Sequence, residues 1–188
     1  MDFIEDEVWK DIKGDEKTYS DKSFENCTFQ NCSFVKSIFH KCLFIDCHFT
    51  SCDLSMSGWS ESIINNAHFE DSKLTGIDFS LKRNKLSQLA FNCCNLNYSI
   101  FTDLNLPKSI FIDTTIRNSD FTGANLKEAV FTNCDLADTR FFKTYLQKAD
   151  FNTAENFSID PENNNVKKAI FSYNNVLNLL NKYELTIQ

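Results

Sequence analysis

The sequence predicts a repeat protein whose chain turns a corner every five residues. Large apolar residues recur at every fifth position from Tyr19 to Phe151, with a single two-residue slip of phase between residues 80 and 90. The residue two places before each of them is usually small. A spacing of five fits neither a helix, with about 3.6 residues per turn, nor a strand, which alternates every two residues. Each turn of the chain must therefore point one large and one small side chain inward.

The repeat is too regular to arise by chance. All 27 central positions are aromatic or aliphatic, and they hold 15 of the 19 Phe residues. The small positions are mostly Cys, Ser, Ala or Thr, with exceptions such as Lys22, Ile77, Asn84, Leu89 and Leu104. Only four Gly and two Pro occur among the 188 residues, which excludes collagen-like and low-complexity chains.

Stretches such as Cys32–Lys36 (CSFVK) and Ala124–Glu128 (ANLKE) resemble the repeats of the pentapeptide-repeat family. The resemblance covers residues 17–155. It implies an all-β fold, a right-handed quadrilateral β-helix of about seven coils with four pentapeptides per coil. In this fold the large central residue fills the tube and the small residue packs beside it.

A coil of 20 residues sorts the central positions into four columns. Two opposite columns are wholly aromatic, one with Tyr19, Phe39, Trp59, Phe79, Phe101, Phe121 and Phe141, the other with Phe29, Phe49, Phe69, Phe91, Phe111, Phe131 and Phe151. The other two become aliphatic after the first coils and hold Phe24, Phe44, Ile64, Leu86, Leu106, Leu126 and Leu146, and Phe34, Leu54, Leu74, Leu96, Ile116 and Leu136. Such an arrangement fills a tube evenly. The columns stay in step only if residues 80–90 hold a two-residue insertion, which makes Ser80–Lys85 a small bulged loop.

Residues 1–16 are expected to form an irregular first coil that caps the tube. Ile4 and Trp9 continue the five-residue phase, and Trp9 falls in an aromatic column. A helix is the alternative, because Ile4, Val8 and Ile12 have helical spacing and Gly14 can end a helix. The β-helix itself is predicted for residues 17–155.

Residues 156–188 are expected to form a loop, a helix and a tail. The stretch 156–165 is rich in turn residues, and 167–171 is expected to be one more extended segment. A short α-helix is predicted from Ser172 to about Asn181. Because so short a helix is marginal alone, it covers the last coil, contacts a second copy, or does both. The candidate capping or dimer-forming residues are Phe171, Val176, Leu177, Leu179, Leu180 and Tyr183.

The formal net charge of −7 argues against a generic nucleic-acid-binding surface, because phosphate binding needs clustered Lys and Arg. No apolar run approaches the roughly 20 residues that span a bilayer. The start of the chain, MDFIEDE, lacks the basic and apolar regions of a secretory signal. We therefore expect a cytoplasmic protein that contacts neither membranes nor nucleic acid directly.

The sequence contains no motif of catalysis or cofactor binding. It has no nucleophile–base set, phosphate-binding Gly loop or carboxylate pair in a cleft. Seven of the eight Cys occupy small inward positions, where they are expected to be buried apolar residues; Cys93 is the exception. His48 and His68 lie 20 residues apart and are expected to stack on the surface. The chain is therefore expected to be no enzyme and to hold no metal or cofactor.

The acidic residues are unevenly spread over the expected faces. The face through Phe29 to Phe151 has a net charge of −4, the face through Tyr19 to Phe141 has −2, and the other two are near zero. The candidate partner-binding acidic residues on these two faces are Glu61, Glu70, Asp71, Asp78, Asp103, Asp113, Asp120 and Asp150. Lys82, Arg83 and Lys85 in the insertion are candidate loop contacts.

The C-terminal arrangement and the acidic faces resemble the Qnr group of the family and its MfpA and McbG types. This resemblance implies a homodimer built by the C-terminal helix. It also implies an acidic mimic of DNA that binds DNA gyrase or topoisomerase IV and counters quinolones or a peptide toxin. The alternative is a scaffold with another protein partner, bound through exposed apolar residues: Ile38, Leu43, Ile45, Ile110, Ile112 and Phe142.

Overall fold

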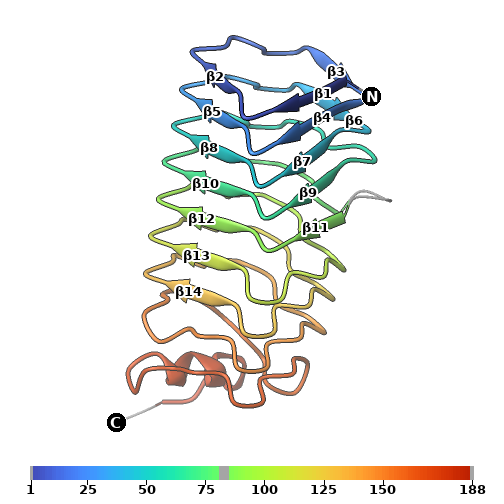
Figure 1. Ribbon diagram of the computed structural model, residues 1–188. Coiled ribbons are helices and arrows are strands. Elements are labelled where there is room, and N and C mark those ends of the chain that lie inside the picture. Colours follow the sequence, from blue (N-terminus) through green and yellow to red (C-terminus); the bar gives the residue numbers. More distant parts are fainter. Residues whose placement is uncertain (1, 81–84, 187–188) are drawn as a thin grey trace.

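The protein is a right-handed β-helix with a four-sided cross-section, as predicted (Figure 1). The computed structural model describes residues 2–80 and 85–186. Every coil has four short straight segments joined by corners, and successive coils stack into a tube. We call the four sides faces A to D in chain order. In the second coil they are centred on Phe24, Phe29, Phe34 and Phe39, respectively.

Parallel strands run along three of the faces. Face A contains β1 (Asp2–Glu5), β4 (Lys22–Glu25), β7 (Leu43–Ile45), β9 (Ile63–Asn65) and β11 (Lys85–Ser87). Face B contains β2 (Val8–Lys10), β5 (Thr28–Gln30), β8 (His48–Thr50), β10 (His68–Glu70), β12 (Ala90–Asn92), β13 (Ile110–Ile112) and β14 (Val130–Thr132). Face D contains β3 (Thr18–Ser20) and β6 (Ile38–His40). Isolated bridges continue the pairing on these faces and join the coils along face C.

Paired residues are 20 positions apart except across the insertion. Phe29 pairs with Phe49, whereas Phe69 pairs with Phe91 and Ile64 pairs with Leu86. The two extra residues are therefore accommodated without the loss of a face. Residues 81–84, including the candidate loop contacts Lys82 and Arg83, lie outside the described residues. Lys85 belongs to β11, where its backbone pairs with Ile63, rather than to a projecting loop.

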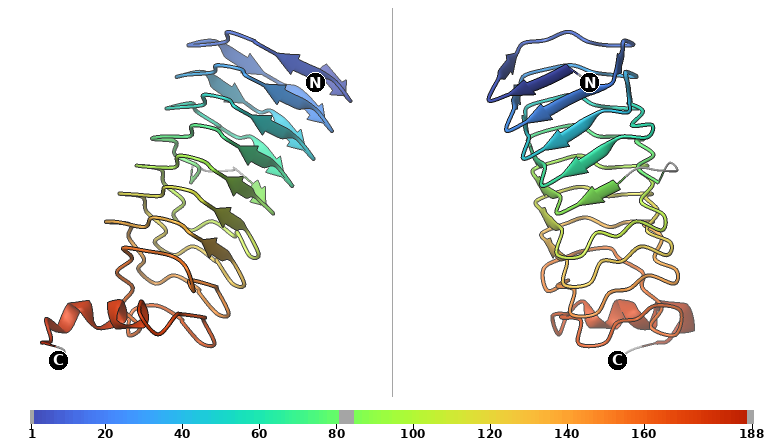
Figure 2. Two further views of the ribbon diagram at one scale, coloured as in Figure 1. Left: turned by 90° about the vertical axis from the view of Figure 1, so that its left-hand side faces the viewer. Right: turned by 45° about the vertical axis from the view of Figure 1, so that its right-hand side comes forward.

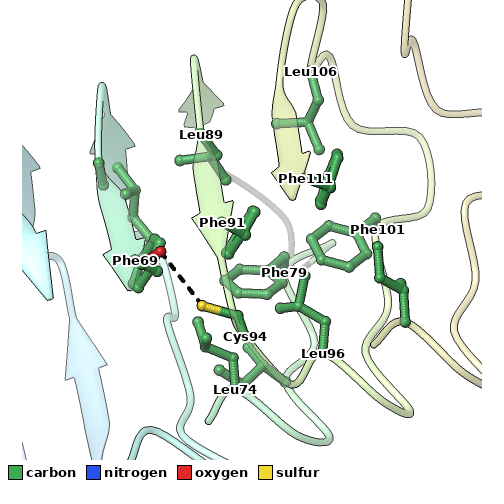
Figure 3. Close-up of a cluster of buried hydrophobic side chains, with 14 of the residues drawn as sticks. Phe69, Leu74, Phe79, Leu89, Phe91, Cys94, Leu96, Phe101, Leu106 and Phe111 are labelled. Atoms are coloured by element: carbon green, nitrogen blue, oxygen red, sulfur yellow. Dashed lines mark hydrogen bonds between the residues drawn. The ribbon is translucent and has the colours of Figure 1, made fainter. Parts of the chain in front are cut away.

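The predicted aromatic columns fill the tube. Phe rings stack along face B, as for Phe111 and Phe131, whose ring centroids are 4.7 Å apart with planes 2° apart. The face D column stacks likewise, and its rings meet those of face B edge-on: Phe111 and Phe121 are 6.2 Å apart at 83°. Figure 3 shows part of this interior, with leucines on either side of the two aromatic columns. The edge-on contacts suit the ring quadrupoles.

The small inward residues tie each coil to the previous one. Most thiols and hydroxyls at these positions donate to the carbonyl 23 residues earlier, or 25 residues earlier across the insertion; Ser109, whose hydroxyl has no partner, is an exception. Examples are Ser119 Oγ to the Leu96 carbonyl at 2.9 Å and Cys94 Sγ to the Phe69 carbonyl at 3.4 Å (Figure 3). Burying a polar group without a hydrogen-bond partner costs free energy, so such bonds stabilise the stack of coils. The preference for Cys, Ser and Thr is therefore more than a preference for small size.

The corners are made by residues in the left-handed backbone region, which the sequence reasoning did not foresee. Among the described residues, the second residue after nearly every centre has a positive φ, for example 51° at Asn26, 52° at Asp46 and 58° at Lys148; Thr153, after Phe151, is an exception. Only Gly76 and Gly123 are glycines at such corners. Asn and Asp tolerate this region best among the other residues, which explains part of the abundance of these residues.

Residues 2–20 form a first coil that is regular, whereas the expected first coil was irregular and a helix was the alternative. β1 pairs with β4, β2 pairs with β5, and no helix occurs in this described stretch. Gly14 occupies a central position because a Cβ there would lie 2.3 Å from Tyr19 Oη. The Tyr19 ring, stacked on Phe39 at 5.3 Å, takes the room that a larger residue would need.

The C-terminal end is covered by a turn-rich loop and a short helix. Phe157 and Ile159 are buried in the 156–163 loop, and the bridge from Asp150 to Ile170 adds a last partial coil. The helix, η1 (Val176–Tyr183), is a 3₁₀ helix rather than the predicted α-helix and begins four residues after Ser172. Its two Asn residues, Asn178 and Asn181, are poor α-helix formers. Figure 2 shows η1 lying across the end of the tube.

Within the described residues, no helix has both the length and the apolar character that a membrane crossing requires.

Candidate functional site

The eight candidate acidic residues lie on two opposite faces, so they do not form one continuous site. The first group is on face B and its corner with face C, and consists of Glu70, Asp71, Asp113 and Asp150. The second is on face D and its corner with face A, and consists of Glu61, Asp78, Asp103 and Asp120. A flat partner can therefore reach only one group at a time.

Three of these carboxylates stabilise the turns of the tube. Asp78, Asp120 and Asp150 each precede a central residue, and each accepts a hydrogen bond from the backbone N–H two residues later, at 2.8 to 2.9 Å. Asn95 does the same for Asn97 at 3.0 Å. An Asp or Asn at this position is thus favoured by local structure. Its occurrence alone is weak evidence for a binding role.

The corner between faces B and C has a local negative field. Glu70, Asp71 and Asp113 are exposed, and Asp113 accepts a hydrogen bond from Asn133 Nδ2 at 3.0 Å. Cys93 lies between them on this corner. Desolvation and then the carboxylates of Asp71, Asp113 and Glu70 raise the pKa of the Cys93 thiol. These three acidic side chains therefore act on the same stretch of surface.

Asp103 is the exposed acid on the opposite corner, between faces D and A. Its carboxylate lies over Gly123, where an added Cβ would be 2.0 Å from Asp103 Oδ1. Gly123 also has a φ of 71°. The glycine thus makes room for the carboxylate of the preceding coil as well as turning the corner.

The strongest charge asymmetry runs along the tube rather than around it. Residues 2–80 contain 15 acidic and 7 basic residues, a net charge of −8, whereas residues 85–186 contain 11 and 10, a net charge of −1. Sequence reasoning by face overlooked this difference, although a count along the chain reveals it. The acidic surface therefore belongs mainly to the N-terminal half.

Face C is nearly neutralised by ion pairs between neighbouring coils. Lys36 pairs with Glu16 at 4.0 Å and Lys73 with Asp53 at 3.9 Å. Arg117 pairs with Asp135. Although desolvation opposes it, hydrogen bonds from Asn156 and Arg117 hold the pKa of Asp135 below its usual range. The paired carboxylates of face C are consequently less available to a basic partner than unpaired ones.

The candidate C-terminal residues divide into two sets. Phe171 and Leu179 pack against the core, and the Phe171 ring stacks on Phe151 at 5.5 Å. Asn175 Nδ2 donates to the carbonyl oxygens of Phe151, at 2.7 Å, and Ala154, at 3.1 Å, so the start of η1 covers the end of the tube. The other set is exposed by 37 to 49% and comprises Val176, Leu177, Leu180 and Tyr183.

The candidate apolar residues of the scaffold alternative are scattered over three faces. Leu43 and Ile45 lie on face A, Ile110 and Ile112 on face B, and Ile38 and Phe142 on face D. Phe142 is partly covered by Arg140 and Lys143, whose cationic groups lie 5.8 and 5.4 Å from its ring centroid. Ile110 and Ile112, beside Val130, form a compact apolar area on face B, and Leu43 and Ile45, beside Ile63, form another on face A.

The described surface offers no enclosed cleft suited to catalysis. A hollow at the C-terminal end is lined by Lys143, Tyr145, Asn164 and Lys167 among others and is wide open to solvent. Among the described residues, no three His, Cys, Asp or Glu side chains are placed to hold a metal ion. His48 and His68 stack as expected, with ring centroids 4.9 Å apart.

The comparisons with solved structures extend over the whole chain. A trypsin-treated form of QnrB1, described as a plasmid-mediated fluoroquinolone resistance protein, is similar with a TM-score of 0.74 and 15% identity, over 100% of this chain and 99% of that one. Full-length QnrB1 gives 0.73 and 16%, over 97% and 100%. HetL from the cyanobacterium Nostoc sp., described as involved in heterocyst differentiation regulation, gives 0.53 and 13%, over 89% and 87%. At these identities the similarity is one of fold.

The sequence itself matches two family models. Residues 22–83 match the pentapeptide repeat region, and residues 91–127 and 119–154 match pentapeptide repeats (8 copies). No curated protein matches the sequence. The family matches cover more than half of the chain and coincide with the stacked coils. The chain therefore belongs to the pentapeptide-repeat family.

Proposed function

We propose that this protein is a non-enzymatic binding protein that engages a type II topoisomerase, DNA gyrase or topoisomerase IV, and protects it from quinolones or a peptide toxin. It presents carboxylates on a rigid rod to an enzyme surface that otherwise binds DNA phosphates. The proposal places the protein in the cytoplasm with its partner. It requires no cofactor and no direct contact with nucleic acid.

The charge distribution carries this proposal. Residues 2–80 have a net charge of −8 and are built into a rigid tube, where strand pairing holds the coils in register. A rigid surface that carries charge of one sign steers and orients a partner whose surface carries charge of the opposite sign. The exposed Glu70 and Asp71 belong to this charge, and the exposed Asp103 and Asp113 extend it into the following coils.

The similarity to QnrB1 supports the proposal without carrying it alone. QnrB1 is described as a fluoroquinolone resistance protein, and its fold matches this chain from end to end. The exposed Val176, Leu177 and Leu180 on η1 support a homodimer through the C-terminal ends. Such a dimer doubles the length of the acidic rod.

Charge reversal in the acidic half tests the proposal. The variant Glu70→Lys with Asp71→Lys changes two exposed residues, and Lys36 and Lys41 already occupy corners like that of Asp71. We expect the affinity for intact gyrase, measured by biolayer interferometry, to fall about tenfold or more. The matched control is Asp138→Lys with Glu155→Lys, which makes the same change of charge on the less charged C-terminal half. It should change the affinity less than about twofold.

A scaffold function with a different protein partner is the second candidate, and the compact apolar area on face B favours it. Ile110 is 41% exposed and pairs with Val130, with Ile112 alongside. If gyrase binding is absent or insensitive to both charge variants, the topoisomerase proposal is wrong. Loss of a pulled-down partner in Ile112→Lys then identifies the apolar area as the binding surface.

A further inference from the structure

Face A differs from the other faces because its charges are separated along the tube. In its N-terminal coils the residues just before and after each centre include the acids Glu5, Asp6, Glu25 and Asp46 and no Lys or Arg, while Lys22, further from the centre, is paired with Asp2 at 2.9 Å. From residue 105 onward the same positions hold Lys108, Lys127, Lys148, Lys167 and Lys168, with Glu128 as the single acid. Face C, by contrast, alternates the two signs and pairs them between coils.

Most of these charges have no partner of opposite sign within the chain. Asp6 and Asp46 accept hydrogen bonds from Asn26 and Asn66, at 2.5 and 2.6 Å, which leave their charge in place. Over residues 2–80 and 85–186, Glu5 and Glu25 form no ion pair, and the same is true of three of the lysines: Lys108, Lys167 and Lys168.

Glu128 is already neutralised by its neighbours. Lys148 Nζ and Lys127 Nζ lie 3.2 and 3.8 Å from Glu128 Oε1. The hydrogen bond from Lys148 and then its charge hold the pKa of Glu128 below its usual range. The lower half of face A is therefore a basic strip, although the protein as a whole is acidic.

We propose that a second copy of this chain packs on face A in antiparallel orientation, so that the acidic half of each copy covers the basic half of the other. A two-fold axis parallel to the strands at the level of β11 reverses the direction of the tube but keeps the strand direction. It places the level of Ile4 opposite that of Val166, Phe24 opposite Leu146, and Phe44 opposite Leu126. Because the contact is isologous, each pair of opposite charges occurs twice in the dimer.

This register brings opposite charges together at three levels. Glu5 and Asp6 meet Lys167 and Lys168 of the second copy. Glu25 meets Lys148 of the second copy. Asp46 meets its Lys127 and also lies opposite its Glu128, whose charge Lys127 and Lys148 already neutralise. The acidic and basic residues stand one or two places after the centres, on or beside the corner with face B. Because the axis keeps the strand direction, it brings this side of one copy against the same side of the other.

Apolar side chains on the same face add to the contact. Leu43, Ile45 and Ile63 are half-buried on β7 and β9, and Phe3 is 60% exposed on β1. Tyr145, 52% exposed, comes to lie one coil from Phe3 of the second copy. Figure 1 shows β1, β4, β7, β9 and β11 stacked along one side of the tube, and the other three faces stay available.

A charge swap tests the proposal on the full chain. Glu25 and Lys148 lie six coils apart, about 29 Å at the usual strand spacing, so they cannot meet within one copy. We expect the dimer dissociation constant from sedimentation equilibrium to be about tenfold higher for Glu25→Lys or Lys148→Glu than for the wild type at 50 mM NaCl. The combined variant should return to the wild-type value, because each copy then offers the swapped pair.

Salt and a helix variant distinguish this contact from a dimer through η1. At 500 mM NaCl the face A dimer should weaken about tenfold, because screening is then strong. Leu180→Glu, which alters the exposed side of η1, should leave the charge-swap pattern intact. Asp138→Lys on face C is the surface-charge control and should have no effect. The proposal is overturned if the dimer dissociation constant does not depend on salt, or if the combined variant dimerises as weakly as the single variants. Either outcome holds whatever the result with gyrase.

Discussion

At the residue scale, the five-residue repeat assigns a different task to each position. The centre fills the tube, the small residue two places earlier donates to the preceding coil, and the second residue after the centre turns the corner. Sequence analysis identified the first two positions by size. The hydrogen bonds and the left-handed corners were missed because they depend on backbone directions that a residue pattern does not display.

The cysteines give the first prediction. Seven of the eight are buried, and burial raises the pKa of Cys47, Cys94 and Cys134 to about 12. A thiol reacts as the thiolate, so a thiol-specific reagent at pH 8 should modify only Cys93 in the folded protein. All eight should react after unfolding in urea. Cys93→Ser is the control and should abolish the reaction of the folded protein; rapid reaction of several thiols would contradict the buried assignment.

The stacked histidines predict a pH effect. Desolvation and then the neighbouring His48 lower the pKa of His68 below 6.5. Between the folded pKa and about 6.5 the unfolded chain therefore binds more protons, and the free energy of unfolding falls as the pH is lowered through this window. An NMR titration should place the His68 midpoint below 6.5. In His68→Gln the loss of stability between pH 7.5 and 5.5 should be smaller; an equal loss would contradict this assignment.

At the element scale, the aromatic columns and their spacing were predictable, because burial repeats every five residues and coils repeat every 20. The form of the two ends was not. Ile4, Trp9 and Gly14 fit a regular first coil, since Tyr19 fills the space above Phe34. At the other end, Phe157 and Ile159 fill the core from positions out of phase with the repeat, and Asn175 caps the carbonyl groups of the last full coil.

The aromatic column predicts how much the loss of one buried ring lowers the free energy of unfolding. Phe111 is fully buried between Phe91 and Phe131, with its edge towards Phe121. Phe111→Ala should lower the free energy of unfolding in urea by about 3–5 kcal/mol, because a cavity remains. Phe111→Asp should prevent folding, since the tube offers its charge no partner. Phe142→Ala, at a partly exposed outward position, is the control and should cost far less; a stable Phe111→Asp variant would refute the column assignment.

At the scale of the whole molecule, sequence analysis predicted an acidic rod but not how its charge is divided. Counting by face treated Asp78, Asp120 and Asp150 as binding candidates, whereas their turn hydrogen bonds supply a structural reason for them. The structure separates Glu70, Asp71 and Asp113 from Asp103 by placing them on opposite corners. The excess of −8 in residues 2–80 is the feature that most distinguishes this surface.

The proposed function is tested most directly by the supercoiling activity of DNA gyrase in the presence of a fluoroquinolone, with this protein titrated into the reaction. The account predicts that low concentrations restore supercoiling and that high concentrations inhibit it, because a DNA mimic displaces first the drug-sensitive complex and then DNA itself. The variant with Glu70→Lys and Asp71→Lys should need at least about tenfold more protein for the same rescue. No effect on gyrase or topoisomerase IV at tens of micromolar would contradict the account.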